Sequence, residues 1–184
     1  QTVTYDGRAY LQATDQKYDV IMVDAYQDIT IPFQMSTTEF FSLVKEHLKK
    51  NGVMVVNMNM QTDDPDNINE YLSDTIAGVF DSVYTADVAN NTNRELFASD
   101  NPQMLNVFEE QLANLQEPDL KKFLAGIGPS ITVYEKGEHI LTDDKAPVEL
   151  LGMQVIDSII EDEVGYYKEK FREGDLDSLL KEVL

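Results

Sequence analysis

The sequence contains no cysteine, no long apolar run and few basic residues, and each absence excludes a class of protein. Zero cysteines in 184 residues exclude disulfides and thiolate metal sites. No apolar run approaches the roughly 20 residues that a membrane helix needs. No basic segment followed by an apolar one opens the chain, as a secretion signal would. We therefore expect no membrane partner and a cytoplasmic location.

The shortage of positive charge narrows the possible partners. The sequence has 14 Lys and Arg and 34 Asp and Glu, which gives a net charge of −20. A phosphate backbone would be repelled, so we expect no nucleic-acid partner. Small cations would be attracted by the same field. The alternative is that the acidity only keeps the protein soluble.

The stretch "YDVIMVDAYQD", residues 18–28, predicts a buried strand that ends in polar side chains. Its apolar part, 20–23, is continuous, which is typical of a strand buried on both faces of a parallel sheet. Composition agrees with a globular domain, at 42% hydrophobic and 26% charged residues.

The pattern around this strand alternates between strand and helix. A short strand at 2–5 leads to the Asp6-Gly7 turn and a helix start, and the strand at 19–24 follows. "MSTTEFFSLVKEHLKKNG" predicts a helix with Ser36 as N-cap and Glu39 as its capping-box partner. Its apolar stripe is Phe40, Leu43, Val44 and Leu48. Asn51-Gly52 ends the helix, and 52–59 predicts a second buried strand.

The remaining elements extend the same architecture. The pattern predicts a helix at 67–80, strands at 82–88 and 94–99 that pair as an antiparallel hairpin at the sheet's edge, helices at 102–115 and 118–125, a loop rich in Gly and Pro, and a helical region at 148–183. We expect an α/β fold with a partial Rossmann-like, mostly parallel sheet, the edge hairpin and C-terminal helices. Residues 1–135 would form the sheet domain and 136–184 a loop and helical extension.

Polar clusters follow three of the predicted strands. They lie at residues 5–7, 24–28 and 57–59. Ligands of parallel sheets bind at the carboxyl ends of the strands, so these clusters predict a site along one rim. No G-x-G-x-x-G motif is present, so we expect the chain to be the second half of a domain whose nucleotide-cradling half precedes it.

Several of these motifs occur together in one known family. "TYDGRAYL", "YDVIMVDAYQD" and "TTEFFSLVKEHLKKNGVMVVN" resemble spermidine synthases, which belong to the class I S-adenosylmethionine-dependent methyltransferase-like superfamily. "LTDDKAPVELL" resembles the tail of the broader spermidine-synthase-like group, including members fused to membrane transporters. The resemblance covers residues 2–60 well and 140–152 moderately.

The resemblance implies roles for individual residues. Asp6, with Gly7, would contact the adenine of the donor, and Asp24 would accept a proton from the attacking amine. The family usually has a second acid three residues after the first, where this chain has Gln27, followed by Asp28. Tyr26, Gln27 and Asp28 would form a loop over the acceptor.

Each of these residues also has a structural alternative. Asp6 can simply start a turn, and Asp24 can be a loop acid satisfied by backbone amides. Tyr26 and Gln27 can pack the loop. We interpret Asp143 and Asp144 as a turn or helix N-cap.

The implied function is a spermidine-synthase-like aminopropyltransferase. It would move an aminopropyl group from decarboxylated S-adenosylmethionine to a diamine such as putrescine. The alternatives are a small-molecule methyltransferase, with S-adenosylmethionine as co-substrate, or a non-catalytic module that retains the fold. We do not expect this 184-residue piece to catalyse alone.

Two further expectations concern metals and assembly. His47 suits the last turn of its helix, and His139 lies in a charged loop. Neither has a partner at metal-ligand spacing, so we expect no metal site. An exposed strand edge and uncovered apolar faces predict a homo-oligomer, such as a dimer.

Overall fold

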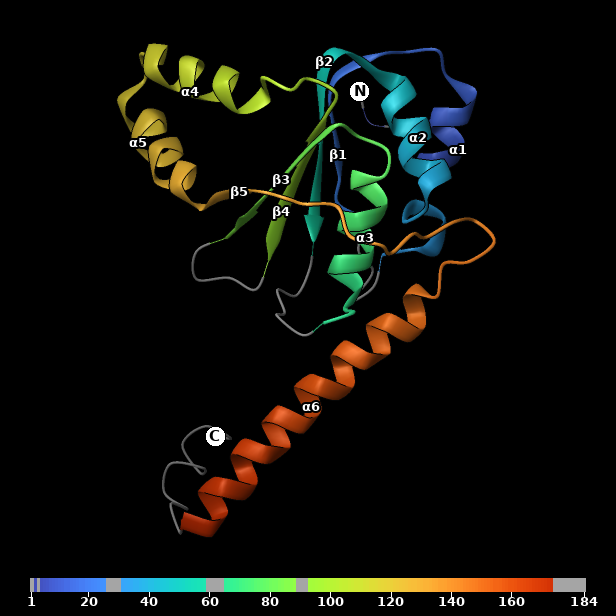
Figure 1. The fold of residues 1–184 in the computed structure, drawn as a ribbon, viewed down its shortest axis with the longest axis vertical. Coiled ribbons are helices and arrows are strands. Elements are labelled where there is room, and N and C mark those ends of the chain that lie inside the picture. Colours follow the sequence, from blue (N-terminus) through green and yellow to red (C-terminus); the bar gives the residue numbers. More distant parts are fainter. Residues whose placement is uncertain (1, 3, 26–30, 59–64, 89–92, 174–184) are drawn as a thin grey trace.

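The computed structural model describes residues 2, 4–25, 31–58, 65–88 and 93–173, which form a mixed α/β fold (Figure 1). In chain order the elements are α1 (Gly7–Ala13), β1 (Tyr18–Val23), a 3₁₀ turn (Phe33–Met35), α2 (Thr38–His47), β2 (Leu48–Met58), α3 (Ile68–Ala77), β3 (Ser82–Asp87), β4 (Arg94–Ser99), α4 (Met104–Asn114), α5 (Pro118–Ile127), a second 3₁₀ turn (Gly128–Ser130), β5 (Ile131–Val133) and α6 (Val148–Glu173).

The strands form one sheet in the order β1-β2-β4-β3-β5. β1 and β2 pair in parallel, with Val23 opposite Val56. The other three ladders are antiparallel. β4 lies between β2 and β3, and β5 pairs with the outer side of β3. The α/β fold and the β3–β4 pairing are confirmed. The expectations of mostly parallel pairing and of a hairpin at the edge are wrong for the described strands, because β5 lies outside the hairpin.

One face of the sheet carries the hydrophobic core. Figure 1 shows α1, α2 and α3 on this side of the sheet. Met54, Val56 and Met58 of β2 alternate toward it, as the two-residue period of a strand requires. The helices contribute the buried side chains Phe40, Phe41, Val44, Ile68, Leu72 and Ile76.

The opposite face is only partly covered. Val20 and Met22 of β1 are 53% and 74% exposed, so the prediction of a strand buried on both faces is wrong. α4 and α5 lie over the other end of this face and have no fully buried residue. An apolar cavity of about 430 Å³ lies between them and the sheet, with Val53, Phe97 and Phe108 in its lining. The continuous apolar run in β1 therefore reflects one covered face and one open face.

Several element boundaries differ from the sequence predictions. α2 begins one residue later than expected, because the hydroxyl of Thr37, not that of Ser36, accepts the N–H of Phe40. Glu39 forms no capping box and instead accepts the N–H of Asp143. β2 starts at Leu48, before Asn51, whose φ of 62° lies in the left-handed region that asparagine tolerates. Among residues 2–5, the described ones are not in a strand.

The segment after β5 returns to the core before α6 begins. Leu141 is buried, and so are Val148, Leu151 and Val155 at the start of α6. From there α6 extends away from the sheet (Figure 1). The boundary proposed at residues 135 and 136 remains a prediction. None of the helices in the described ranges is long and apolar enough to cross a bilayer.

Candidate active site at the carboxyl ends of the parallel strands

Asp24 follows directly after β1, and its side chain is bonded to the neighbouring strand. The Nδ2 of Asn57, near the end of β2, donates to Oδ1 of Asp24 over 3.1 Å. The Nδ2 of Asn93, just before β4, donates to Oδ1 of Asn57 over 2.9 Å. The three side chains form a chain of hydrogen bonds along the rim. The prediction that clusters 24–28 and 57–59 share one rim is confirmed for Asp24 and Asn57.

Glu95 adds a second carboxylate to this rim. It lies on β4 directly opposite Asn57 in the antiparallel ladder. Partial burial raises the pKa of the Glu95 carboxyl, and the negative charge of Asp24 raises it further. The two acids are therefore close enough to influence each other electrostatically. The sequence does not predict Glu95 at the site. The motif "RELFAS" indicates a strand with one acidic residue, but not that this strand pairs with β2.

Asp6 lies at the start of α1, where it acts as the N-cap. Its Oδ1 accepts the N–H of Ala9 over 2.8 Å. This bond satisfies one of the free N–H groups of the helix end, which agrees with the turn alternative. Gly7 is the first residue of α1. The predicted contact of these two residues with a donor stays a prediction.

The predicted acceptor loop lies outside the described residues. Tyr26, Gln27 and Asp28 belong to the range 26–30, of which the structure gives no account. Their assignment to the acceptor therefore stays a prediction.

Asp143 of the "LTDDKAP" motif forms hydrogen bonds to residues of two helix starts. Both of its carboxylate oxygens accept from the Arg8 guanidinium, over 2.8 and 2.6 Å, and Oδ1 also accepts from the hydroxyl of Thr37 over 2.7 Å. The bond to Arg8 is the main cause that lowers the pKa of Asp143. The motif thus joins α1, α2 and the segment before α6. Asp143 lies in a turn, as predicted, but it serves these contacts and not the N-cap of a helix.

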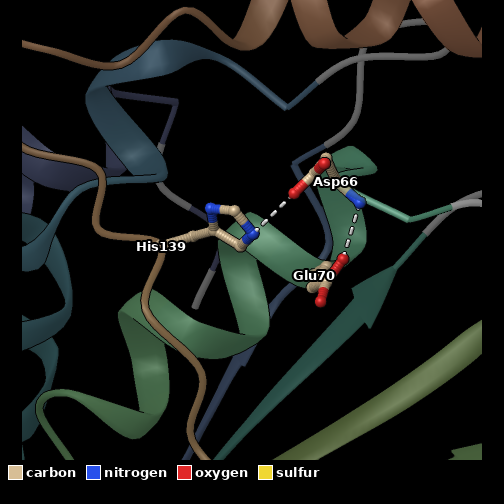
Figure 2. Close-up of side chains that lie close together, drawn as sticks. All are labelled: Asp66, Glu70 and His139. Carbon is tan, nitrogen blue, oxygen red and sulfur yellow. Dashed lines mark hydrogen bonds and ion pairs between the residues drawn. The ribbon is translucent and has the colours of Figure 1, made fainter.

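The two histidines have different surroundings. His47, at the end of α2, is buried, and its ring nitrogens contact the carbonyl oxygens of Leu43 and Thr14, each over 2.8 Å. His139 points toward two carboxylates at the start of α3 (Figure 2). Its Nε2 lies 3.1 Å from Oδ1 of Asp66, and one ligand atom each of Asp66, Glu70 and His139 lie within 4.8 Å of one another.

The strand order and the acid-amide rim define an α/β protein whose candidate site lies where two parallel strands end. The model of the spermine/spermidine synthase domain matches residues 1–91. A probable polyamine aminopropyl transferase of Bifidobacterium longum (strain NCC 2705) is 51% identical in an alignment of 197 positions, gaps included, that covers 98% of this chain and 44% of the relative. The chain is therefore similar to the spermine/spermidine synthase family over residues 1–91 and to this relative over nearly its whole length, and its described residues form a mixed α/β fold.

Two further comparisons give lower identity. A polyamine aminopropyltransferase of Vibrio vulnificus (strain CMCP6) is 28% identical over 163 residues, which cover 80% of this chain and 52% of that protein. A crystal structure of a probable spermidine synthase from Corynebacterium glutamicum ATCC 13032 superposes with a TM-score of 0.42 at 19% identity, covering 73% of this chain and 52% of that one. The chain spans about half the length of the curated relatives it matches.

Proposed function

We propose that the protein to which this chain belongs is an aminopropyltransferase. It transfers the aminopropyl group of decarboxylated S-adenosylmethionine to a diamine such as putrescine and releases methylthioadenosine. The observation that carries this proposal is the 51% identity, over 98% of the chain, to a probable polyamine aminopropyl transferase. The proposal concerns the whole protein, because the relatives extend well beyond the aligned part.

Asp24 is the proposed proton acceptor. An amine is protonated at neutral pH and must lose a proton before its nitrogen can attack carbon. In the transfer the nitrogen lone pair forms the new C–N bond, the C–S bond breaks, and its electron pair neutralises the sulfonium. Asp24 takes the proton that the nitrogen gives up. The exposed position of this carboxylate and its bond to Asn57 support the role, since the amide holds Oδ1 in one direction.

Glu95 is the proposed partner of the second, non-reacting ammonium of the diamine. Gln27 stands where the family usually has another acid, so the acceptor loop supplies one negative charge fewer. Glu95, opposite Asn57 and within the electrostatic range of Asp24, supplies that charge from β4 instead. A bound ammonium between two carboxylates would relieve the repulsion that they exert on each other. The protein's net charge of −20 also favours a cationic acceptor.

The donor side of the proposal rests on Asp6 and Gly7. The N-cap bond to Ala9 fixes the direction of the Asp6 carboxylate at the start of α1, and the residue is exposed. A fixed, exposed carboxylate can accept a hydrogen bond from the amino group of adenine. S-adenosylmethionine, with or without its carboxyl group, would be a co-substrate here, and the proposed chemistry needs no metal.

The assembly and location are proposals as well. Within the described residues β1 is an edge strand with an exposed face, which supports a homodimer of this 184-residue chain. A cytoplasmic location suits an enzyme whose substrates are small metabolites. The strongly negative charge supports the expectation that nucleic acid is not a partner.

The test measures product formation by the whole protein to which the chain belongs. It is incubated with decarboxylated S-adenosylmethionine and putrescine, and methylthioadenosine is quantified by mass spectrometry. A parallel reaction contains S-adenosylmethionine as the only donor. Putrescine-dependent methylthioadenosine is the expected result. Formation of S-adenosylhomocysteine in the parallel reaction, without methylthioadenosine in the first, would replace the proposal by a methyltransferase.

A further inference from the structure

We propose that Asp66, Glu70 and His139 form a binding site for a divalent transition-metal ion such as Zn²⁺. The three residues come from two distant parts of the chain: Asp66 lies just before α3 and Glu70 in its first turn, and His139 lies in the segment between β5 and α6 (Figure 2). The proposal does not depend on the proposed enzymatic function, because none of these residues takes part in the Asp24 site.

The ligand atoms already lie close to the spacing that a metal imposes. Nε2 of His139 and Oδ1 of Asp66 are 3.1 Å apart. Two ligands of one tetrahedral zinc ion, each bonded at about 2.0–2.2 Å, lie about 3.4 Å apart. One ligand atom of each of the three residues falls within 4.8 Å of the others. Side-chain rotations would have to bring the three atoms around one ion. The side chain of Asp66 is 74% exposed and can make them.

His139 is held in place by contacts that leave Nε2 directed at the carboxylates. Its ring stacks on Tyr71 with the centroids 4.0 Å apart and the planes at 21°. Its backbone N–H donates to Oδ2 of Asp74, a fully buried carboxylate, over 3.0 Å. These contacts fix the ring before any ion binds, which lowers the ordering cost of binding.

The donor set selects the class of metal. One imidazole nitrogen with two carboxylates suits zinc and its transition-metal neighbours, whereas magnesium and calcium prefer oxygen ligands alone. The imidazole must be unprotonated to bind, so the ion takes the place of the proton in a His139–Asp66 ion pair. Three protein ligands leave one position of a tetrahedral ion for water.

The bound ion would join the segment after β5 to the start of α3. The contacts that already connect this segment to α3 include the His139–Asp66 pair at its start and the bonds to Asp74 further along the helix. The simpler explanation of the cluster is that ion pair alone, with Glu70 accepting the N–H of Asp66 over 2.8 Å as part of the helix start. The experiment must therefore separate a specific metal site from an ordinary ion pair in a very acidic protein.

The chain has two histidines, so nuclear magnetic resonance of the ¹⁵N-labelled imidazole rings reports on the site and on a control at once. Zn²⁺ is titrated into the protein, with Mg²⁺ in a parallel titration. We expect one equivalent of Zn²⁺ to shift the His139 ring signals and to leave those of the buried His47 in place. Mg²⁺ should move neither. His139 signals that do not move while zinc is added would overturn the proposal.

Variants then assign the oxygen ligands. Dissociation constants for Zn²⁺ are measured by competition with a chelating dye for Asp66→Asn, Glu70→Gln and His139→Gln. Each should bind zinc at least about tenfold more weakly than the parent protein. Glu135→Gln removes an exposed acid from the same segment and should bind as tightly as the parent. Equal weakening by Glu135→Gln and Asp66→Asn would show attraction by the general negative field and would overturn the site.

Discussion

At the scale of the residue, Asp24 is where the proposed chemistry can be tested most directly. Asp24→Asn keeps the shape and the contact with Asn57 but cannot accept a proton, so turnover should fall by about 10²–10⁴-fold. The free energy of unfolding should change by less than about 0.5 kcal/mol, because the side chain is exposed. Mass spectrometry of methylthioadenosine and thermal unfolding measure the two effects.

Asp19→Asn is the matched control for Asp24. Asp19 is an exposed acid on the same strand, at the end opposite the rim, and pairs with Lys49 over 2.8 Å. This variant removes the same charge and should keep its turnover. Near-normal turnover of Asp24→Asn, or an equal loss in Asp19→Asn, would contradict the role of Asp24.

We expect the ionised carboxylate of Glu95 to lower the free energy of unfolding at neutral pH. Its raised pKa means that the folded protein resists ionisation of this carboxyl. The resulting loss of stability is absent at low pH and develops as the pH rises above the unfolded value of about 4.3. Because water screens this partly exposed carboxyl, Glu95→Gln should raise the free energy of unfolding at pH 7 by less than about 1 kcal/mol, with almost no difference near pH 4.

The same variant should weaken substrate binding. If Glu95 holds the distal ammonium, Glu95→Gln raises the KM for the diamine by about tenfold, which corresponds to one charge-assisted hydrogen bond. Thermal melts at pH 4 and 7 and initial rates over a range of putrescine concentrations measure the two effects. A more stable variant with an unchanged KM would place Glu95 outside the acceptor site.

At the scale of the element, Asp143 connects α1 and α2 to the segment before α6. Because its pKa is lowered in the folded protein, its ionised form stabilises the fold above the unfolded value of about 3.9, and this stabilisation is lost as the pH falls through the folded value. The side chain is 41% exposed, so water screens the pair with Arg8. Asp143→Asn should lower the free energy of unfolding by about 1 kcal/mol at pH 7, and by progressively less as the pH falls below about 4.

The Asp19–Lys49 pair again provides the comparison for Asp143. Its side chains are 80% and 52% exposed, so Asp19→Asn should change the free energy of unfolding by close to zero at any pH. Urea unfolding at pH 3, 5 and 7 distinguishes the two variants. A cost for Asp143→Asn that does not depend on pH would mean that the charge of Asp143 does not stabilise the connection.

The segment after β5 depends on the close approach of Gly137 to the buried Asp74. A Cβ at position 137 would lie 2.5 Å from Oδ2 of Asp74. That carboxylate cannot easily move, because it accepts bonds from the hydroxyl of Tyr134 and from the N–H groups of Gly137 and His139. Burial, followed by the bond to Asp74, raises the pKa of Tyr134, so the tyrosine stays a donor. Gly137→Ala should therefore lower the free energy of unfolding by about 1–3 kcal/mol, measured by thermal unfolding.

Gly126→Ala is the control for this clash. No atom lies within 4 Å of a Cβ built at Gly126, which is part of α5. Alanine should stabilise the helix by up to about 1 kcal/mol. A Gly137→Ala variant as stable as the parent would show that the contact with Asp74 can relax.

The accuracy of the sequence predictions differs with the range of the contacts that decide each element. The local signals placed α2, α3, α4 and α5 to within a few residues, because periodicity and caps act within one helix. β5 was missed because it has three residues and exists only through its pairing with β3. The exposure of β1 was misjudged because an apolar run does not tell which faces are covered.

In the candidate site, too, the residues fixed by local patterns are predicted and those brought in by long-range contacts are not. Asp24 and Asn57 were found because the ends of parallel strands meet on one rim. Glu95 and Asn93 approach that rim through the antiparallel insertion of β4, which no local pattern predicts. The spacing of His139 gave no sign of Asp66 and Glu70, because these residues meet only when the segment after β5 folds back over α3.

At the scale of the whole molecule, the exposed edge and face of β1 are the features from which we predict association with another chain. The described sheet has two edges, β1 and β5. β5 is short, with three residues, whereas β1 has six, with Val20 and Met22 exposed beside its free edge. A long, apolar edge strand favours pairing with another chain. The 184-residue chain should therefore form a dimer through β1.

Substitution of the open face of β1 tests this dimer. Val20→Asp with Met22→Lys places opposite charges on the exposed face and should shift the chain to a monomer at micromolar concentration. The core should remain intact, because both side chains point away from it. Val133→Lys, on the exposed face of β5, is the matched control and should leave the dimer unchanged. Light scattering during size-exclusion chromatography measures the mass. A monomeric parent chain, or a monomer produced equally by Val133→Lys, would contradict association through β1.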